Sequence, residues 1–189
     1  MKKIAVFASG NGSNAQHISE HFANSESIRV VAIYCNNPNA YVIQRAAALK
    51  IPLVLFDREK FYAEDTILKD LLKRKIDLII LAGFLWLMPV NIIKAFGRRI
   101  LNIHPALLPL YGGKGMYGAR VHETVIENGD TESGITVHLV DEMYDKGEVL
   151  FQIKCAVSPD DTPKTLAEKI HLLEYEHYPR VIAGYITKL

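Results

Sequence analysis

An asparagine and a histidine two residues apart are the side chains of this sequence best suited to acyl-group chemistry. The segment Asn102–Pro105, Asn-Ile-His-Pro, follows an apolar run that ends at Leu101. Side chains two apart on a strand share a face, so the amide and the imidazole can both donate hydrogen bonds to one oxygen. Acyl transfer requires such donors when a carbonyl becomes a tetrahedral oxyanion. The motif predicts a catalytic pair, and a purely structural histidine is the alternative.

A glycine-rich turn near the amino terminus predicts a phosphate site. The segment Ser9–Ala15 separates a predicted strand from a predicted helix, and a helix N-terminus after such a turn offers free N–H groups to an anion. The turn also matches the dinucleotide fingerprint. However, the next strand ends in Cys35-Asn36-Asn37-Pro38, without the carboxylate that holds ribose hydroxyls in those sites. A monophosphate held by the turn is therefore favoured, and a tight turn whose polar residues cap the helix is the alternative.

The elements that must position these residues alternate along the 189-residue chain. Continuous apolar strands separated by helices predict an α/β fold, with a mostly parallel sheet covered by helices on both faces. The predicted strands are Lys3–Ala8, Arg29–Cys35, Leu53–Phe56, Leu78–Ala82, Arg99–Ile103, Ile135–Val140 and Val149–Val157. The predicted helices are Ser13–Ala23, Tyr41–Leu49, Lys60–Lys73, Pro89–Phe96, Ala119–Asn128 and one that opens at Asp161–Pro163. The last two strands are joined by a loop alone, so one of them is expected to be antiparallel to the rest.

Composition argues against several classes of function. A net charge of +1 gives no general attraction to nucleic acid or to an anionic membrane, and no apolar stretch approaches the roughly 20 residues that span a bilayer. Cys35 and Cys155 form no Cys-x-x-Cys pair, which predicts free thiols in a reducing, cytoplasmic setting. His17–His21 matches a zinc pattern, but both histidines fall on the predicted solvent side of their helix, so we expect no metal.

Three segments resemble the folate-dependent formyltransferases. Asn102–Pro109 resembles the first signature of that family, Gly134–Val140 followed by Asp145-Lys146-Gly147 resembles the second, and Ala82-Gly83-Phe84 stands where the family has its folate loop. The resemblance covers nearly the whole chain. It implies a single Rossmann-like formyltransferase domain over residues 1–189. It also implies 10-formyltetrahydrofolate as co-substrate, with no metal.

The resemblance also implies a set of site residues. The catalytic residues are Asn102, His104 and Asp145. The substrate-binding residues are Gly12, Ser13, Asn14 and Glu174, with Glu174 at the substrate ribose. The folate-binding residues are Arg58, Leu85, Trp86, Leu87, Met88, Asn102 and Asp141. For Glu174, a solvated helix carboxylate is the alternative interpretation.

Roles follow from the same resemblance. Asn102 is expected to donate to the oxyanion, and an ionised Asp145 is expected to raise the pKa of His104 and favour its imidazolium. Asp141 is a rival acid, although only Asp145 has the x-Gly that follows it in the family pattern. The glycine-rich segment 111–118 is expected to form a mobile loop near the site. His122, just beyond it, either contacts substrate or braces this loop.

Within that family, the sequence favours a small phosphorylated amine, 5-phosphoribosylglycinamide, as formyl acceptor. Members that act on tRNA carry a further C-terminal domain, and those that hydrolyse the formyl folate carry an N-terminal one, whereas this chain runs only from Met1 to Leu189. The expected reaction gives formylglycinamide ribonucleotide and tetrahydrofolate in purine biosynthesis. The expected partners are these small molecules, without nucleic acid or membrane. A nucleotide-binding regulatory module with an altered Rossmann loop and a tRNA-binding protein remain as alternatives.

Overall fold

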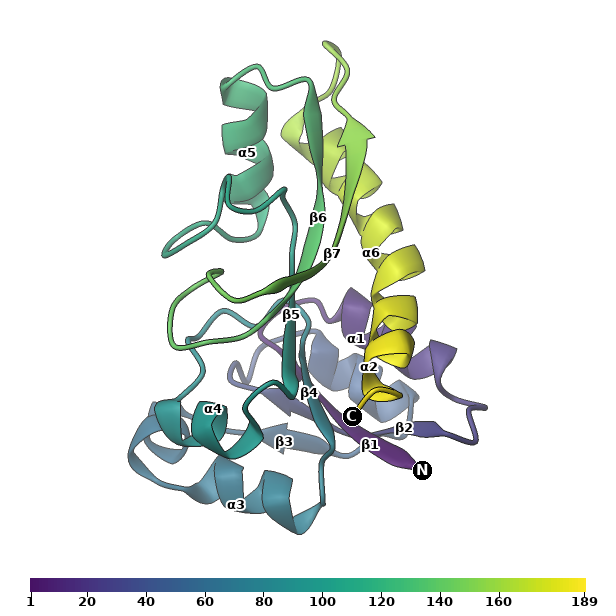
Figure 1. The fold of residues 1–189 in the computed structure, drawn as a ribbon, viewed down its shortest axis with the longest axis vertical. Coiled ribbons are helices and arrows are strands. Elements are labelled where there is room, and N and C mark those ends of the chain that lie inside the picture. Colours follow the sequence, from purple (N-terminus) through teal and green to yellow (C-terminus); the bar gives the residue numbers. More distant parts are fainter.

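A seven-stranded sheet in the order β3-β2-β1-β4-β5-β6-β7 forms the centre of the computed structural model, which describes residues Met1 to Leu189 (Figure 1). Strands β1 to β5 are parallel, and β6 is antiparallel to both of its neighbours. The strands are β1 (Lys2–Ala8), β2 (Ile28–Cys35), β3 (Leu53–Leu55), β4 (Leu78–Leu81), β5 (Ile100–His104), β6 (Glu132–Leu139) and β7 (Val149–Ala156). The mostly parallel sheet with one antiparallel strand late in the chain is thus confirmed.

The helices follow the predicted order with one difference. They are α1 (Ser13–His21), α2 (Val42–Ala48), a π-helical turn η1 (Glu59–Ala63), α3 (Thr66–Lys73), α4 (Val90–Phe96), α5 (Ala119–Glu127) and α6 (Pro163–Ile186). The helix predicted over 60–73 is therefore two elements, with an extended Glu64 between them. In one continuous α-helix, Phe61 would lie about 120° around the axis from Ile67. The break allows both side chains to be buried in the same core.

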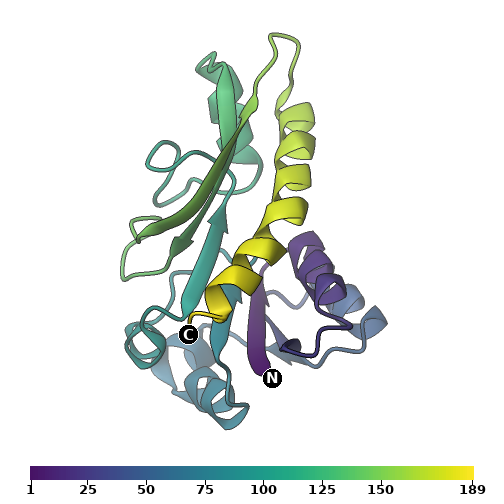
Figure 2. The ribbon, with the colours of Figure 1, turned by 45° about the vertical axis from the view of Figure 1, so that its right-hand side comes forward.

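Each face of the sheet is covered by its own apolar core. On β1, Ile4 and Val6 face a core shared with α1, α2 and α6, whereas Ala5 and Phe7 face a core shared with α3 and α4. Figure 2 shows the long α6 running beside the sheet on the same side as α1. Strands buried on both faces need apolar side chains at every position, which explains their continuous hydrophobic pattern.

The strand order creates a crevice beside β1. The chain moves from β1 outward to β2 and β3, then returns to the other side of β1 to form β4 and β5. The loops that follow β1 and β4 therefore diverge, and open α/β sheets bind ligands at such a switch point.

Helix α6 begins with a capping box in which Thr162 and Thr165 bond each other's backbone, as expected for a helix that opens at Pro163. None of the helices combines the length and apolar character needed to cross a membrane.

Candidate active site

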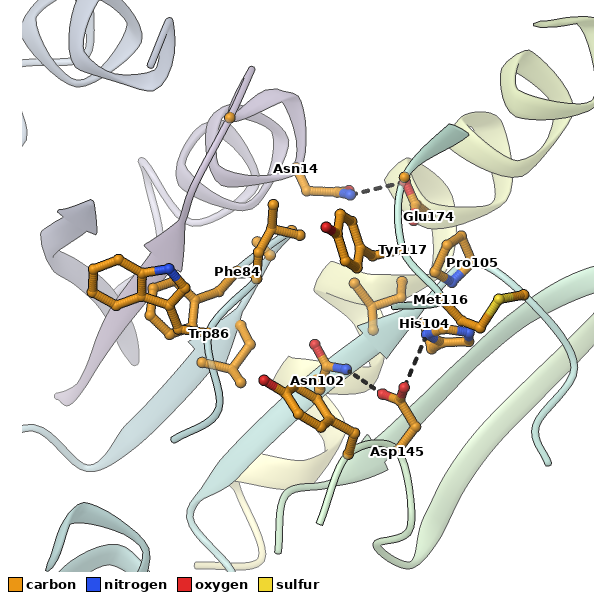
Figure 3. Close-up of a pocket in the computed structure, with 18 of the residues that line it drawn as sticks. Asn14, Phe84, Trp86, Asn102, His104, Pro105, Met116, Tyr117, Asp145 and Glu174 are labelled. Carbon is orange, nitrogen blue, oxygen red and sulfur yellow. Dashed lines mark hydrogen bonds and ion pairs between the residues drawn. The ribbon is translucent and has the colours of Figure 1, made fainter. Parts of the chain in front are cut away.

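A cavity of about 840 Å³ lies at the carboxyl ends of β1, β4 and β5 (Figure 3). Its walls come from the loops after these strands, residues 113–118 of the glycine-rich segment, the β6–β7 loop and α6. The predicted site residues that line it are Gly12, Ser13, Asn14, Arg58, Leu85, Trp86, Leu87, Met88, Asn102, His104, Asp145 and Glu174. Asn14 and Glu174, for example, are 160 positions apart in the sequence and meet in this one cavity.

Asp141 is the predicted site residue that the structure leaves outside this lining. Its carboxylate accepts a hydrogen bond from the backbone N–H of Met143 at 2.8 Å. The side chain is therefore engaged in the turn that begins the β6–β7 loop. Of these two aspartates, Asp145 is the one that faces the cavity, as the x-Gly pattern favoured.

Strand pairing places Asn102 beside a histidine that the sequence predictions did not include. Asn102 on β5 is directly opposite His138 on β6. His138 Nδ1 lies 2.7 Å from the carbonyl oxygen of Leu139, and since a carbonyl only accepts, the ring donates from Nδ1. Its Nε2 can then accept from Asn102 Nδ2, which is 3.0 Å away. This bond fixes the orientation of the Asn102 amide.

The second amide hydrogen of Asn102 is also engaged, because Nδ2 lies 3.4 Å from Asp145 Oδ1. The expected oxyanion contact from Asn102 therefore requires one of its two protein bonds to be replaced. The bond to Asp145 is the longer of the two, and longer hydrogen bonds are weaker. Exchange of this bond for a bond to the reacting oxygen is the smaller rearrangement.

Thr136 holds the chain that leaves the site. It is directly opposite His104 on the neighbouring strand. Its hydroxyl donates to the carbonyl of Ala106 at 2.7 Å and accepts from the N–H of Leu108 at 3.0 Å. Thr136 and His138, two residues apart on β6, thus have separate roles. Thr136 fixes the segment after His104, and His138 fixes the amide of Asn102.

His104 lies between a backbone carbonyl and a carboxylate. Its Nε2 donates to the carbonyl oxygen of Tyr111 at 2.7 Å, and its Nδ1 lies 3.7 Å from Asp145 Oδ2. Burial lowers the pKa of His104 by more than the charge of Asp145 and the bond to Tyr111 raise it. Asp145 thus raises the pKa of His104 as expected, but the imidazolium is not favoured overall, because desolvation of a residue that is 4% exposed outweighs an attraction across 3.7 Å.

Asp145 is held in place by backbone geometry. Its own φ of 54° is left-handed, and its Oδ2 accepts from the N–H of Gly113 at 2.9 Å. Burial raises the pKa of Asp145, but His138 and His104, when protonated, and the Gly113 N–H together lower it below its ordinary value. Gly147 completes the turn, because a Cβ there would lie 1.7 Å from the carbonyl oxygen of Leu139. The Asp-x-Gly pattern thus produces an ionised carboxylate in the cavity wall.

The opposite end of the cavity pairs the N-terminus of α1 with Glu174. Gly12 starts the helix with φ 74°, and no side chain caps the helix, so the capping alternative is not observed. Glu174 is 5% exposed. Its Oε2 accepts from Asn14 Nδ2 and from His171 Nδ1, each at 2.9 Å. Glu174 is therefore a buried, oriented carboxylate and not a solvated one, and its hydrogen bond raises the pKa of His171.

The remaining wall is apolar and carries one cation. Phe84 and Trp86 lie across the cavity from His104 and Asp145 (Figure 3). The guanidinium of Arg58 stacks over the ring of Trp86, 4.9 Å from its centroid. Tyr62 donates to the carbonyl of Leu87 at 2.8 Å and holds the irregular segment 85–88. This wall has the flat apolar surface that a ring ligand needs.

Two functional candidates, His138 and His171, were missed from the sequence, although each carried a signal. His138 stands two residues after Thr136, on a strand expected to pair with another. His171 precedes Glu174 by three residues, the spacing of neighbours on one helix face.

Met116 and Tyr117 of the glycine-rich segment also reach the cavity (Figure 3). No three potential ligand side chains are grouped to hold a metal ion.

Comparison with known proteins gives a consistent result. The model of the formyl transferase family matches residues 2–182. The phosphoribosylglycinamide formyltransferase of Bacillus subtilis is 37% identical over 187 residues, which are 96% of this chain and 93% of that protein. The chloroplastic enzyme of the same name from Arabidopsis thaliana is 41% identical over 97% of this chain, which spans 65% of that protein's length. Glycinamide ribonucleotide transformylase 1 of Geobacillus kaustophilus has a TM-score of 0.89 at 37% identity, with 98% of this chain and 99% of that chain covered.

Proposed function

Because the chain belongs to the formyl transferase family, we propose that it transfers the formyl group of 10-formyltetrahydrofolate to the amine of 5-phosphoribosylglycinamide. The products are formylglycinamide ribonucleotide and tetrahydrofolate, and the reaction belongs to purine biosynthesis. The observation that carries the proposal is a single cavity with three different regions. One region suits a phosphoribosyl group, the centre suits acyl transfer, and the third suits a flat ring.

The α1 end favours a phosphorylated acceptor. Its first N–H groups are free of side-chain caps and carry the positive end of the helix dipole, which favours an anion. Glu174 lies beside this end through its bond with Asn14. Its second oxygen, Oε1, is left to accept from ribose hydroxyls. A phosphate and a ribose bound here direct the rest of the acceptor toward the centre of the cavity.

The centre can handle the protons of the transfer. The amine nitrogen attacks the formyl carbon, the carbonyl electron pair moves to oxygen, and the new C–N bond leaves the nitrogen positively charged. His104 is suited to accept the proton from this nitrogen at Nδ1, since Nε2 already donates to Tyr111. Asp145, 3.7 Å from Nδ1, stabilises the imidazolium that results. The same proton then passes to the departing folate nitrogen as the old C–N bond breaks, so the ring returns to its starting state.

Asn102 suits the oxyanion role once its bond to Asp145 is exchanged. His138 keeps the amide oriented throughout, because the 3.0 Å bond to Asn102 does not take part in the exchange. The gain in charge on the formyl oxygen favours the exchange, since hydrogen bonds to ionised acceptors are stronger than those to neutral ones. An oriented donor of this kind contributes typically 10²–10³-fold to turnover.

The apolar wall fits the folate. Leu85, Leu87 and Met88 offer apolar surface and backbone groups for a pterin. Arg58 presents a cation for the carboxylate-bearing part of the molecule, and its stacking on Trp86 limits its conformational freedom. Because binding at both ends aligns two substrates over the same centre, much of the rate enhancement comes from orientation. We also propose a cytoplasmic location and small molecules as the sole partners.

A formyl-transfer assay with separate acceptors tests the proposal. The wild-type chain is given 10-formyltetrahydrofolate with 5-phosphoribosylglycinamide, with initiator methionyl-tRNA, or with water alone, and the release of tetrahydrofolate is followed. We expect transfer to the ribonucleotide to exceed the other two rates by at least about 10³-fold, because only that acceptor fills the α1 end of the cavity while the folate occupies the apolar wall. Equal rates with tRNA, or hydrolysis as the main reaction, would refute it.

A further inference from the structure

His122 on α5 has a buried side chain with no hydrogen-bond partner in the protein. The residue is 3% exposed. Its Nδ1 is sealed from the surface without a partner, and Nε2 bonds no protein group either. A buried polar group without a partner is costly, and native proteins rarely keep one without a reason. In His122 the sealed Nδ1 has no access to a ligand, so a reason for keeping the ring in the cavity wall is a bond that Nε2 forms only with the ligand.

The position of His122 connects the two ends of the cavity. The residue lines the cavity wall. Burial lowers the pKa of His122, and the groups whose charges act on the ring are His171 and Glu174 at the α1 end and His104 at the centre. His122 therefore lies within electrostatic reach of both regions. The lowered pKa keeps the ring neutral, with one N–H and one lone pair.

The sealed environment of Nδ1 selects the tautomer. Unpaired buried N–H groups are rarer in proteins than unpaired acceptors, so Nδ1 carries the lone pair and Nε2 carries the proton. Nε2 is also the ring nitrogen left to face the cavity, since Nδ1 has no exposed surface. His122 thus presents a neutral N–H donor between the ribose region and His104. A donor at this point requires an oxygen acceptor on the ligand.

We propose that His122 donates a hydrogen bond from Nε2 to the amide carbonyl oxygen of the acceptor substrate, an inference that rests on the proposed function. A substrate with its phosphate at α1 and its amine at His104 has one strong neutral acceptor between them, the glycinamide carbonyl. Its ribose hydroxyls are matched by the acceptor Glu174 and not by a second donor. One methylene separates the amide carbon from the reacting amine. A bond to the carbonyl oxygen therefore positions the amine for attack.

Two variants of His122 separate this role from a structural one. His122→Leu removes the donor and puts an apolar side chain in the space of the ring, and His122→Gln keeps an N–H donor of similar reach. We expect His122→Leu to lower kcat/KM for 5-phosphoribosylglycinamide by about tenfold or more, since it loses both a hydrogen bond and orientation. His122→Gln should recover part of this loss. The melting temperature should stay the same or rise in His122→Leu, because the unpartnered nitrogen is removed.

Binding measurements locate the contact on the substrate. Calorimetry should show that His122→Leu binds 5-phosphoribosylglycinamide with a higher Kd than wild type. The Kd for ribose 5-phosphate should be the same in both proteins. KM for 10-formyltetrahydrofolate should change less than twofold. Ser133→Ala is the matched control, because Ser133 Oγ is another buried atom without a partner, on β6 and outside the cavity lining. This control should keep wild-type kinetics.

The results of these measurements separate a substrate contact of His122 from a structural role and from failure of the proposed function. A His122→Leu enzyme with kcat/KM within twofold of wild type would overturn the proposal, as would an equal loss of affinity for ribose 5-phosphate. A fall in melting temperature with unchanged kinetics, or failure of both variants to fold, would make His122 a structural residue. A wild-type chain that transfers no formyl group to the ribonucleotide refutes the proposed function itself, before any variant is compared.

Discussion

His104 and His171 each face a carboxylate in the same cavity, yet their pKa values move in opposite directions. His171 donates to Glu174 at 2.9 Å and its side chain is 46% exposed, so the hydrogen bond outweighs burial and the pKa of His171 is raised. His104 has its carboxylate at 3.7 Å and its side chain is 5% exposed, so burial prevails and the pKa is lowered. A neutral His104 is ready to accept a proton, and opposed shifts of this kind often mark the division of acid and base roles.

The first prediction concerns His104 and Asp145 as a unit. His104→Ala should lower turnover by about 10²–10⁴, the usual contribution of a positioned acid or base. Asp145→Asn should cost a comparable factor, because the imidazolium formed during transfer loses its counter-charge. The double variant should be little worse than the more damaged single variant, since groups that act together are not additive. Steady-state turnover of the four proteins measures this.

The pH profile of Asp145→Asn provides the control for that pair. The carboxylate of Asp145 raises the pKa of His104 against the larger effect of burial. Its removal should move the acidic limb of kcat/KM to lower pH, since His104 must be neutral to accept a proton. An unmoved limb, together with an early melting transition, would indicate that Asp145 only stabilises its loop. Multiplicative losses in the double variant would likewise contradict the coupled pair.

At the scale of elements, sequence reasoning succeeded where burial dictates the pattern. Residues Ile4–Ala8 of β1 and all of β4 have apolar side chains because helices cover both faces. It failed at 60–73, where a helical period continues through a break that lets Phe61 reach its core. The period of a helix is local, whereas the position of Phe56, which Phe61 packs against at 4.8 Å between ring centroids, is set by the sheet.

The candidate site also combines local sequence patterns with contacts that depend on how distant segments pack. The Asn-x-His spacing and the glycine-rich turn are local patterns, and they led to residues that line the cavity. The contact between Asn102 and His138 depends on the register of β5 and β6, and the bond between Asn14 and Glu174 joins α1 to α6. Neither contact has a signal within one segment. The same limit explains the pKa of His104, because burial is a property of the packed chain.

The second prediction concerns the turn before α1. Gly12 has φ 74°, and a Cβ there would lie 2.3 Å from Val42 Cγ2, whereas a Cβ at Gly10 would meet nothing within 4 Å. Gly12→Ala should therefore be destabilised by about 1–3 kcal/mol from the backbone alone. In a domain of this size the melting temperature should fall by roughly 2–12 °C. Gly10→Ala should melt like wild type.

Kinetics should distinguish the same two variants. The clash with Val42 displaces the turn that presents the helix N–H groups, so Gly12→Ala should raise KM for 5-phosphoribosylglycinamide more than KM for the folate. Thermal melting and initial rates on the purified variants provide both measurements. If Gly12→Ala keeps its melting temperature and both Michaelis constants, the turn tolerates a side chain and the steric argument for the glycine is lost.

At the scale of the whole molecule, the cavity is assembled from parts that only global folding brings together. The phosphate region comes from the first loop, the central residues from β5 and the loop after β6, and Glu174 from the last helix. Three of the histidines in its walls have pKa values displaced from the ordinary 6.5. Folding therefore changes how many protons these groups bind, and the stability of the entire chain depends on pH through them.

The last prediction is a stability maximum from these histidines near pH 6.5. Burial lowers the pKa values of His104 and His122 below 6.5, so below pH 6.5 the unfolded chain binds protons that the folded chain does not, and stability falls as the pH is lowered. The hydrogen bond to Glu174 raises the pKa of His171 above 6.5. Its contribution is complete below 6.5 and is lost as the pH rises through the folded value.

Melting temperatures from about pH 5 to 8 separate the two limbs, because histidine is the side chain that titrates in this range. His122→Leu should flatten the acidic limb, since one of the two groups that resist protonation in the folded state is gone. His171→Gln should flatten the alkaline limb and leave the acidic one. His177→Gln is the matched control, because His177 also lies on α6 with a carboxylate, Glu176, 3.9 Å away, but outside the cavity lining. If both limbs persist in the first two variants, carboxylates or the amino terminus cause the pH dependence and the histidine assignment fails.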